Sequence, residues 1–194
     1  MLSQAIRVEA DWEFEIGDGA PAIEAWWPGF VDLRRSAASV VDLPEVAELP
    51  TLGDVLIRLN AASSGVWTSK SGVWTSDDGE QFDADEFDAP PGGTAYTYGC
   101  YVDLLPRGEE QWTSADAIAA VCRFWSRAFR SLHLRSCRAD LIIRRAFTPP
   151  ERMHLAVTAY LTGSGFTSGD ARDALEAALP PFADVLCAES TLQW

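Results

Sequence analysis

From residue 96 onward, the spacing of apolar residues switches between two periods, and this pattern restricts the fold more than any other feature of the chain. Apolar side chains occupy every second position of 96–104, 137–144 and 153–161, which is typical of β-strands buried on one face. Thr148-Pro149-Pro150 predicts a turn between the second and third of these segments. The sequence therefore predicts three strands, the last two of them consecutive.

Two amphipathic helices are expected between and after these strands. The first follows Thr113 to Asp116, whose hydroxyls can cap a helix, and its apolar residues recur at spacings of three and four to about Leu134. The second follows the glycine-rich loop 163–169, with Ser168 as its cap. Pro180-Pro181 is expected to end this second helix, because proline lacks the N–H that a helix interior needs.

A final short strand over 183–190 would complete the order β, α, β, β, α, β. With two right-handed crossovers, this order gives an antiparallel sheet with both helices on one face. The prediction is an α+β fold with a ferredoxin-like βαββαβ unit over about residues 96–190.

The first ninety residues carry a weaker pattern. Residues 6–16 favour a strand, and Thr51 is expected to cap a helix over 52–62. No glycine-serine linker separates the two halves, and Pro90-Pro91-Gly92-Gly93 is short enough to be a turn between packed elements. The whole chain is therefore expected to form one compact unit, with residues 1–90 as an α+β extension packed against the ferredoxin-like core.

A hexapeptide occurs twice, as Ser64-Gly-Val-Trp-Thr-Ser69 and as Ser71-Gly-Val-Trp-Thr-Ser76. The copies are offset by an odd number of residues, so on one regular strand Trp67 and Trp74 would point to opposite faces. A hairpin that turns near 69–72 would place both indoles on one face, and we expect that arrangement.

The composition describes an acidic but globular protein. The 194 residues are 47% hydrophobic and include eight Trp, which is too apolar for a disordered chain. A formal charge of −14 disfavours nucleic acids and anionic membranes as partners, because binding either would bring like charges together. No signal peptide or membrane-spanning run stands out, so a cytoplasmic location in a bacterial cell is expected. No CxxC pair occurs, and we expect free, buried thiols at Cys100, Cys122, Cys137 and Cys187.

Charge is distributed unevenly along the chain. Residues 123–152 hold eight of the fifteen Lys and Arg but only two carboxylates, Asp140 and Glu151. This stretch therefore has a formal charge of +6 and the remainder one of −20. Such segregation affects the choice of binding partner and carries little information about the fold.

The densest acidic stretch surrounds two phenylalanines. It is not an EF-hand loop, because Gly79 comes too early for the calcium-binding pattern, and we predict no metal site. It is either a solvated loop or a docking surface for a basic protein, since an apolar anchor ringed by charge is typical of interfaces. The residues of this predicted partner-binding site are Asp77, Asp78, Glu80, Phe82, Asp83, Asp85, Glu86, Phe87 and Asp88.

Arginines offer an alternative site, for an anion. Arg123, Arg127 and Arg130 share one face of the first predicted helix, where they either clamp a phosphate or carboxylate or pair with the chain's own acidic residues. Alternation along the strands places a second polar set on the sheet face opposite the helices: Tyr101, Asp103, Arg138, Asp140, Ile142, Arg144, His154, Thr158 and Tyr160. The alternative anion-binding residues are Arg123, Arg127, Arg130, Arg138, Arg144 and His154.

The sequence carries no catalytic signature. Neither His133 nor His154 stands beside a recognisable nucleophile motif, and loop 163–169 lacks the Lys-Ser/Thr that follows a phosphate-binding loop. We therefore expect no cofactor and a non-catalytic binding protein that docks a basic partner, as inhibitors and immunity proteins do. The alternative is a small-molecule enzyme or sensor that holds an anionic ligand through its arginines. A homodimer that pairs exposed sheet faces is a third hypothesis.

Overall fold

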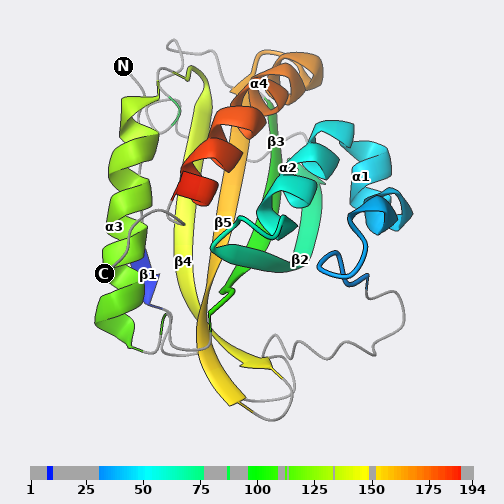
Figure 1. The fold of residues 1–194 in the computed structure, drawn as a ribbon. Coiled ribbons are helices and arrows are strands. Elements are labelled where there is room, and N and C mark those ends of the chain that lie inside the picture. Colours follow the sequence, from blue (N-terminus) through cyan, green and yellow to red (C-terminus); the bar gives the residue numbers. More distant parts are fainter. Residues whose placement is uncertain are drawn as a thin grey trace.

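A five-stranded sheet organises the part of the chain that the computed structural model describes, which is residues 8–10, 31–76, 87, 96–108, 112, 114–132, 134–148 and 152–188 (Figure 1). The spatial order of the strands is β1-β4-β5-β3-β2. The strands are β1 (Val8–Ala10), β2 (Val66–Thr75), β3 (Tyr96–Pro106), β4 (Cys137–Thr148) and β5 (Arg152–Gly165). The helices are the 3₁₀-helix η1 (Ala37–Asp42) and the α-helices α1 (Pro44–Glu48), α2 (Pro50–Asn60), α3 (Ala115–Ser131) and α4 (Ser168–Cys187).

The sheet is antiparallel from β2 to β4, and β1 is added parallel to β4 at one edge. Strand β5 lies between β3 and β4 and runs antiparallel to both, so β3 and β4 are parallel to each other. Helix α3 connects β3 to β4, as in a split βαβ unit. The predicted α+β class, the three strands after residue 96 and the first helix are confirmed.

The predicted final strand is wrong, and with it the strict ferredoxin-like order. Helix α4 does not end at Pro180-Pro181 but continues through both prolines to Cys187, so residues 183–187 are helical. The apolar stripe of α4 extends past the prolines through Phe182 and Leu186, which are 1% and 0% exposed. Burial of this stripe against the sheet outweighs the hydrogen bonds that the prolines cannot donate.

Strand β2 occupies the place beside β3 that the expected last strand would have taken. The first ninety residues therefore supply two strands of the sheet itself, β1 and β2, and are not an extension packed against a separate core. Helix α2 begins at Pro50, one residue before the expected cap Thr51, with Leu49 in the N-cap position. That the chain forms one compact unit stays a prediction.

A β-bulge, not a hairpin, brings the two repeat tryptophans to one face. Strand β2 is continuous, and its register against β3 shifts between Thr68 and Ser71. Trp67 pairs with Leu105 and Trp74 with Gly99, so seven steps on β2 match six steps on β3. Because the bulge absorbs one residue, the odd spacing no longer separates the indoles, and the expected hairpin is wrong.

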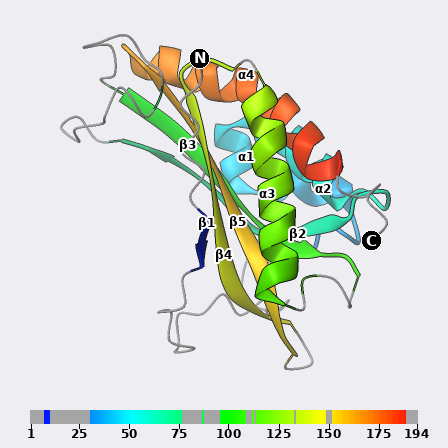
Figure 2. The same ribbon diagram turned by 90° about the vertical axis from the view of Figure 1, so that its left-hand side faces the viewer.

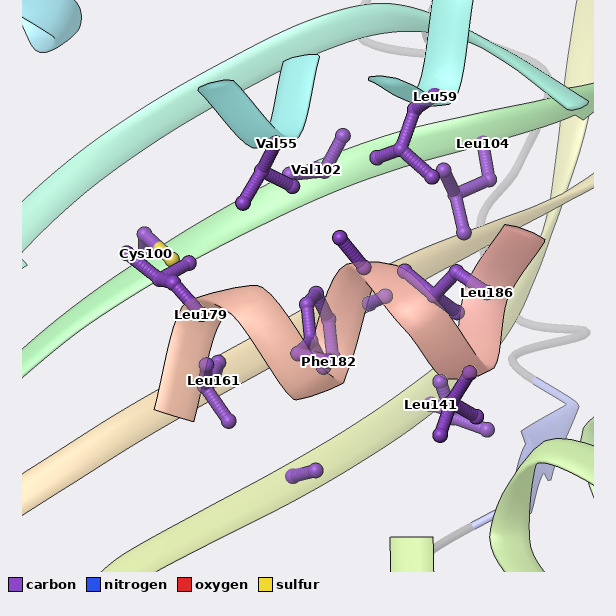
Figure 3. Packing of buried hydrophobic residues seen from close by; sticks show 14 of the residues in the cluster. Val55, Leu59, Cys100, Val102, Leu104, Leu141, Leu161, Leu179, Phe182 and Leu186 are labelled. Atoms are coloured by element: carbon purple, nitrogen blue, oxygen red, sulfur yellow. The ribbon is translucent and has the colours of Figure 1, made fainter. Parts of the chain in front are cut away.

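All four α-helices cover the same face of the sheet (Figure 2). Helix α4 lies between α3 and α2 on the centre of the sheet (Figure 1). Its apolar side chains meet those of β3, β4, β5 and α2 there (Figure 3). Ser114 caps α3 by accepting a hydrogen bond from the N–H of Ala117. The cap of α4 is Thr167, one residue before the predicted Ser168, in a reciprocal capping box with Asp170. Within the described ranges, no helix is long and apolar enough to cross a bilayer.

Candidate functional site

The face of the sheet opposite the helices carries the polar set that the sequence predicted. Tyr101 pairs with Tyr160, which in turn pairs with Asp140 on β4. In the next row, Asp103 pairs with Thr158, and Thr158 pairs with Ile142. The structure therefore places these residues side by side across three strands, as alternation required. We call this surface the open face. The backbone of His154 on β5 lies opposite Ala146 on β4.

Three aromatic rings form a cluster on the open face. The ring of Tyr160 lies 5.7 Å from that of Trp74, nearly edge-on, and 5.8 Å from that of Tyr101. Glycines make room for the outer two rings, because a Cβ at Gly99 would approach Trp74 Cζ2 to 2.2 Å and a Cβ at Gly72 would approach Tyr101 Cε1 to 2.5 Å. Sequence reasoning did not place Trp74 here, because the bulge that turns it to this face leaves no clear signal in the hydrophobic pattern.

Charged groups on the open face are engaged with one another. Arg138 Nε lies 2.8 Å from Asp140 Oδ2, and Arg144 Nη2 donates to Tyr160 Oη at 3.1 Å. Thr158 donates to Asp103 Oδ1 at 2.6 Å. Burial raises the pKa of Asp103 above its usual value, although the Thr158 hydrogen bond and the charges of Lys70 and Arg144 act in the opposite direction.

The six arginine and histidine candidates for anion binding do not form one site. Arg123, Arg127 and Arg130 are exposed on α3, and α3 lies on the opposite side of the sheet from the open face (Figure 2). None of the three is ion-paired with a carboxylate in the described part of the chain. They form a separate cationic ridge along the helix.

The predicted partner-binding segment 77–88 falls outside the described residues except for Phe87. That ring is 3% exposed, so it is buried within the protein and is not an external anchor. Ser76, the residue that precedes the segment, is hydrogen-bonded to β3, since its N–H donates to Thr97 O at 3.1 Å and Thr97 N–H donates to Ser76 Oγ at 2.9 Å. The residue before the acidic segment is therefore held at the base formed by these ends of β2 and β3.

An exposed phenylalanine lies beside this base. Tyr96, the first residue of β3, pairs with Gly165, and the next residue, Phe166, is 59% exposed. Sequence reasoning treated Phe166 only as part of a connecting loop. Its apolar ring among Gly, Ser and Thr in 163–169 was the one available signal.

Carboxylates surround the same end of the molecule. Tyr98 Oη donates to Glu48 Oε1 at 2.8 Å, and Arg172 pairs with Glu176 at 2.8 Å. Burial, the hydrogen bond to Glu48 and the charge of that carboxylate raise the pKa of Tyr98 to about 12. Asp170 and Asp173 are exposed in the first turns of α4.

Neither metal chemistry nor homology assigns an activity. No group of three or more His, Cys, Asp or Glu side chains in the described segments is arranged to hold a metal ion, and His133 lies outside those segments. No protein-family model matches the chain, and comparisons with curated proteins and with solved structures give no significant match.

Proposed function

We propose that this chain is a non-catalytic binding protein that docks a basic partner protein through the acidic segment 77–88 and the exposed Phe166. The observation that carries the proposal is the position of Phe166, 59% exposed and next to the Gly165–Tyr96 pair. The neighbouring Thr97 is hydrogen-bonded to Ser76, the residue that precedes the acidic segment. An apolar side chain ringed by charge combines burial energy with electrostatic attraction of an oppositely charged partner.

The charge of this end of the molecule supports a basic partner. The segment contributes seven carboxylates, and the described carboxylates Glu48, Asp170, Asp173 and Glu176 lie near Tyr98 or in the first turns of α4. A concentration of one sign of charge accelerates encounter with the opposite sign and repels partners of the same sign.

Attachment of the residue before the segment also favours this function. The hydrogen bonds between Ser76 and Thr97 hold that residue against β3, whose first residue, Tyr96, pairs with Gly165 beside Phe166. A fixed attachment point lowers the entropy that binding must remove from a recognition segment.

The test measures how fast the wild-type and variant chains associate with a basic partner protein. This partner is first captured from native cell extract by cross-linking and is then purified. Neutralising Asp83, Asp85 and Glu86 (Asp→Asn, Glu→Gln) is expected to slow association about tenfold at low salt, with a smaller effect at high salt. The matched control neutralises three exposed carboxylates elsewhere, Asp42, Asp54 and Asp116. Equal slowing by both triple variants would remove the segment as the docking site.

The apolar part of the proposal has its own test. Phe166→Ala is expected to speed dissociation about tenfold, because truncation of a central anchor acts mainly on the off-rate. Val41→Ala is the control, since Val41 is 75% exposed and lies in η1. An unchanged off-rate for Phe166→Ala would exclude Phe166 from the interface.

The ridge of Arg123, Arg127 and Arg130 supports the second candidate, an anion-binding sensor or enzyme. These guanidinium groups are exposed, and no ion pair joins them to a described carboxylate. The test is thermal melting with phosphate and with citrate as probes. Stabilisation that disappears in Arg127→Ala but persists in the exposed control Arg35→Ala would support the second candidate, and no stabilisation by either probe would reject it.

A further inference from the structure

A cavity of about 220 Å³ lies beside the bulge in β2. Its polar side includes Ser69 and Lys70, the residues at which the pairing between β2 and β3 is interrupted. Bulges interrupt a strand where side chains are redirected, and they are frequent next to functional sites. None of its described lining residues belongs to the ridge on α3, so the cavity requires an explanation of its own.

One polar atom at this cavity is unsatisfied. Ser69 Oγ is fully buried and has no hydrogen-bond partner among the described residues. A buried hydroxyl without a partner lowers stability, and such groups in native proteins are often those that a ligand or an ordered water completes. Ser69 therefore supplies a donor that the described part of the chain leaves unused.

Tyr101 provides a second donor from the neighbouring strand. Its ring extends across β2 above Gly72, where a Cβ would lie 2.5 Å from Cε1 and 3.2 Å from the hydroxyl oxygen. Any larger residue at this position would displace the ring, so the glycine allows Tyr101 to line the cavity. Burial and the nearby carboxylates of Asp103 and Glu45 raise the pKa of Tyr101, and the phenol remains a donor at neutral pH.

Charges of both signs line the cavity. Lys70 is the only lysine of the chain, and its ammonium group can donate up to three hydrogen bonds. Glu45 contributes a carboxylate, of which Oε1 accepts a hydrogen bond from Ser71 Oγ at 2.5 Å. A ligand with a single charge would therefore meet one attractive and one repulsive group, whereas a ligand with both charges can satisfy each.

The opposite wall is apolar and comes from the segment before α1 and from the first residue of that helix. Val31, Leu33, Leu43 and Pro44 form it. An apolar cavity of ~150 Å³ is large enough to hold benzene. The cavity beside the bulge is larger than this, and it has room for a small branched or aromatic side chain together with a charged head group.

We propose that this cavity binds a free α-amino acid with an apolar side chain. Lys70, Ser69 and Tyr101 would hold the carboxylate, Glu45 would accept from the ammonium group, and the wall of Val31, Leu33, Leu43 and Pro44 would cover the side chain. The chain is then a small-molecule receptor as well as a docking protein, and neither role depends on the other.

The experiment measures melting of the full chain with L-leucine and with two analogues that each lack one charge. L-Leucine is expected to raise the melting temperature in a saturable manner, while 4-methylpentanoate and isopentylamine have at least tenfold lower affinity by calorimetry. No saturable binding of L-leucine or L-phenylalanine would overturn the proposal. Equal affinity of either analogue would overturn the assignment of a ligand carrying both charges.

Ser69→Ala provides the sharpest variant because it is expected to fold. Removal of an unsatisfied buried hydroxyl leaves the melting temperature of the free protein equal or higher, while affinity for L-leucine falls about tenfold. Ser131→Ala at the end of α3 is the matched control, with unchanged affinity. Wild-type affinity in Ser69→Ala would show that L-leucine binds elsewhere.

Discussion

Gly163 of β5 lies directly beneath Ala171 of α4, so closely that a Cβ on Gly163 would come within 2.3 Å of the Ala171 carbonyl oxygen. The same added atom would lie 2.6 Å from the N–H nitrogen of Leu175. Helix α4 therefore packs on the sheet through backbone contact at this point, and its buried side chains reach the core of β3, β4 and β5 from there.

Gly163→Ala is expected to destabilise the protein by about 1–3 kcal/mol, because the helix backbone must move away from the strand. Gly169→Ala in the first turn of α4 is the control. A Cβ there meets only Thr167 Oγ1 at 3.6 Å, and alanine favours a helix by ~0.5–1 kcal/mol. Urea unfolding measures the free energy of unfolding of both variants. A Gly163→Ala protein as stable as wild type would show that α4 does not pack this closely.

Asp103→Asn is expected to stabilise the protein at neutral pH. The pKa of Asp103 is raised in the folded state, mainly by burial, so the folded state binds more protons than the unfolded state in the window above pH 3.8. Stability contributed by this group is therefore lost as the pH rises through that window, and asparagine does not share the loss.

The measurement is the difference in free energy of unfolding between Asp103→Asn and wild type at pH 3.5 and at pH 7. The difference is expected to favour the variant more at pH 7, while Asn Oδ1 can still accept from Thr158. A variant that loses more stability at pH 7 than at pH 3.5 would reverse the sign and show that the folded protein favours the charged form of Asp103.

Arg107→Ala is expected to destabilise the protein by about 2 kcal/mol, because charged hydrogen bonds to backbone carbonyls are lost. Arg107 donates to the carbonyls of Asn60, Ala61 and Ser64 at 2.8, 3.0 and 3.0 Å and so satisfies the end of α2. Arg35→Ala is the control, since Arg35 is 85% exposed and makes one surface ion pair. Chemical denaturation that ranks the two variants equally would contradict this role.

The cysteines are expected to react slowly with a disulfide reagent while the protein is folded. All four are free, and Cys100, Cys122 and Cys137 are buried, as the sequence predicted, whereas Cys187 is only half-buried. Burial raises the pKa of Cys100 and of Cys137 to about 12, which leaves little of the reactive thiolate at neutral pH. Absorbance after mixing with the reagent should show that Cys187 reacts first in buffer. All four thiols should react only after a denaturant is added. Fast reaction of several thiols in buffer would contradict the buried core.

The candidate surfaces were only partly predictable from the sequence. Alternation placed Tyr101, Asp103 and Tyr160 on one face, because the strand period fixes that relation locally. The cavity was not predictable, since Ser69 and Glu45 are distant in the chain and meet only because a bulge in β2 faces α1. Phe166 was also missed, because nothing in a glycine-rich loop tells whether its one ring is buried or exposed.

The sequence by itself determined strands β3, β4 and β5, helix α3, the α+β class and the burial of three of the four thiols, all of which depend on local periodicity and composition. The tertiary structure alone decided that α4 continues through Pro180-Pro181 and that β2 takes the place beside β3. The physical reason is the same in both cases. Local preferences amount to a few kcal/mol, and burying the stripe of Phe182 and Leu186 outweighs them only when a sheet is present to pack against.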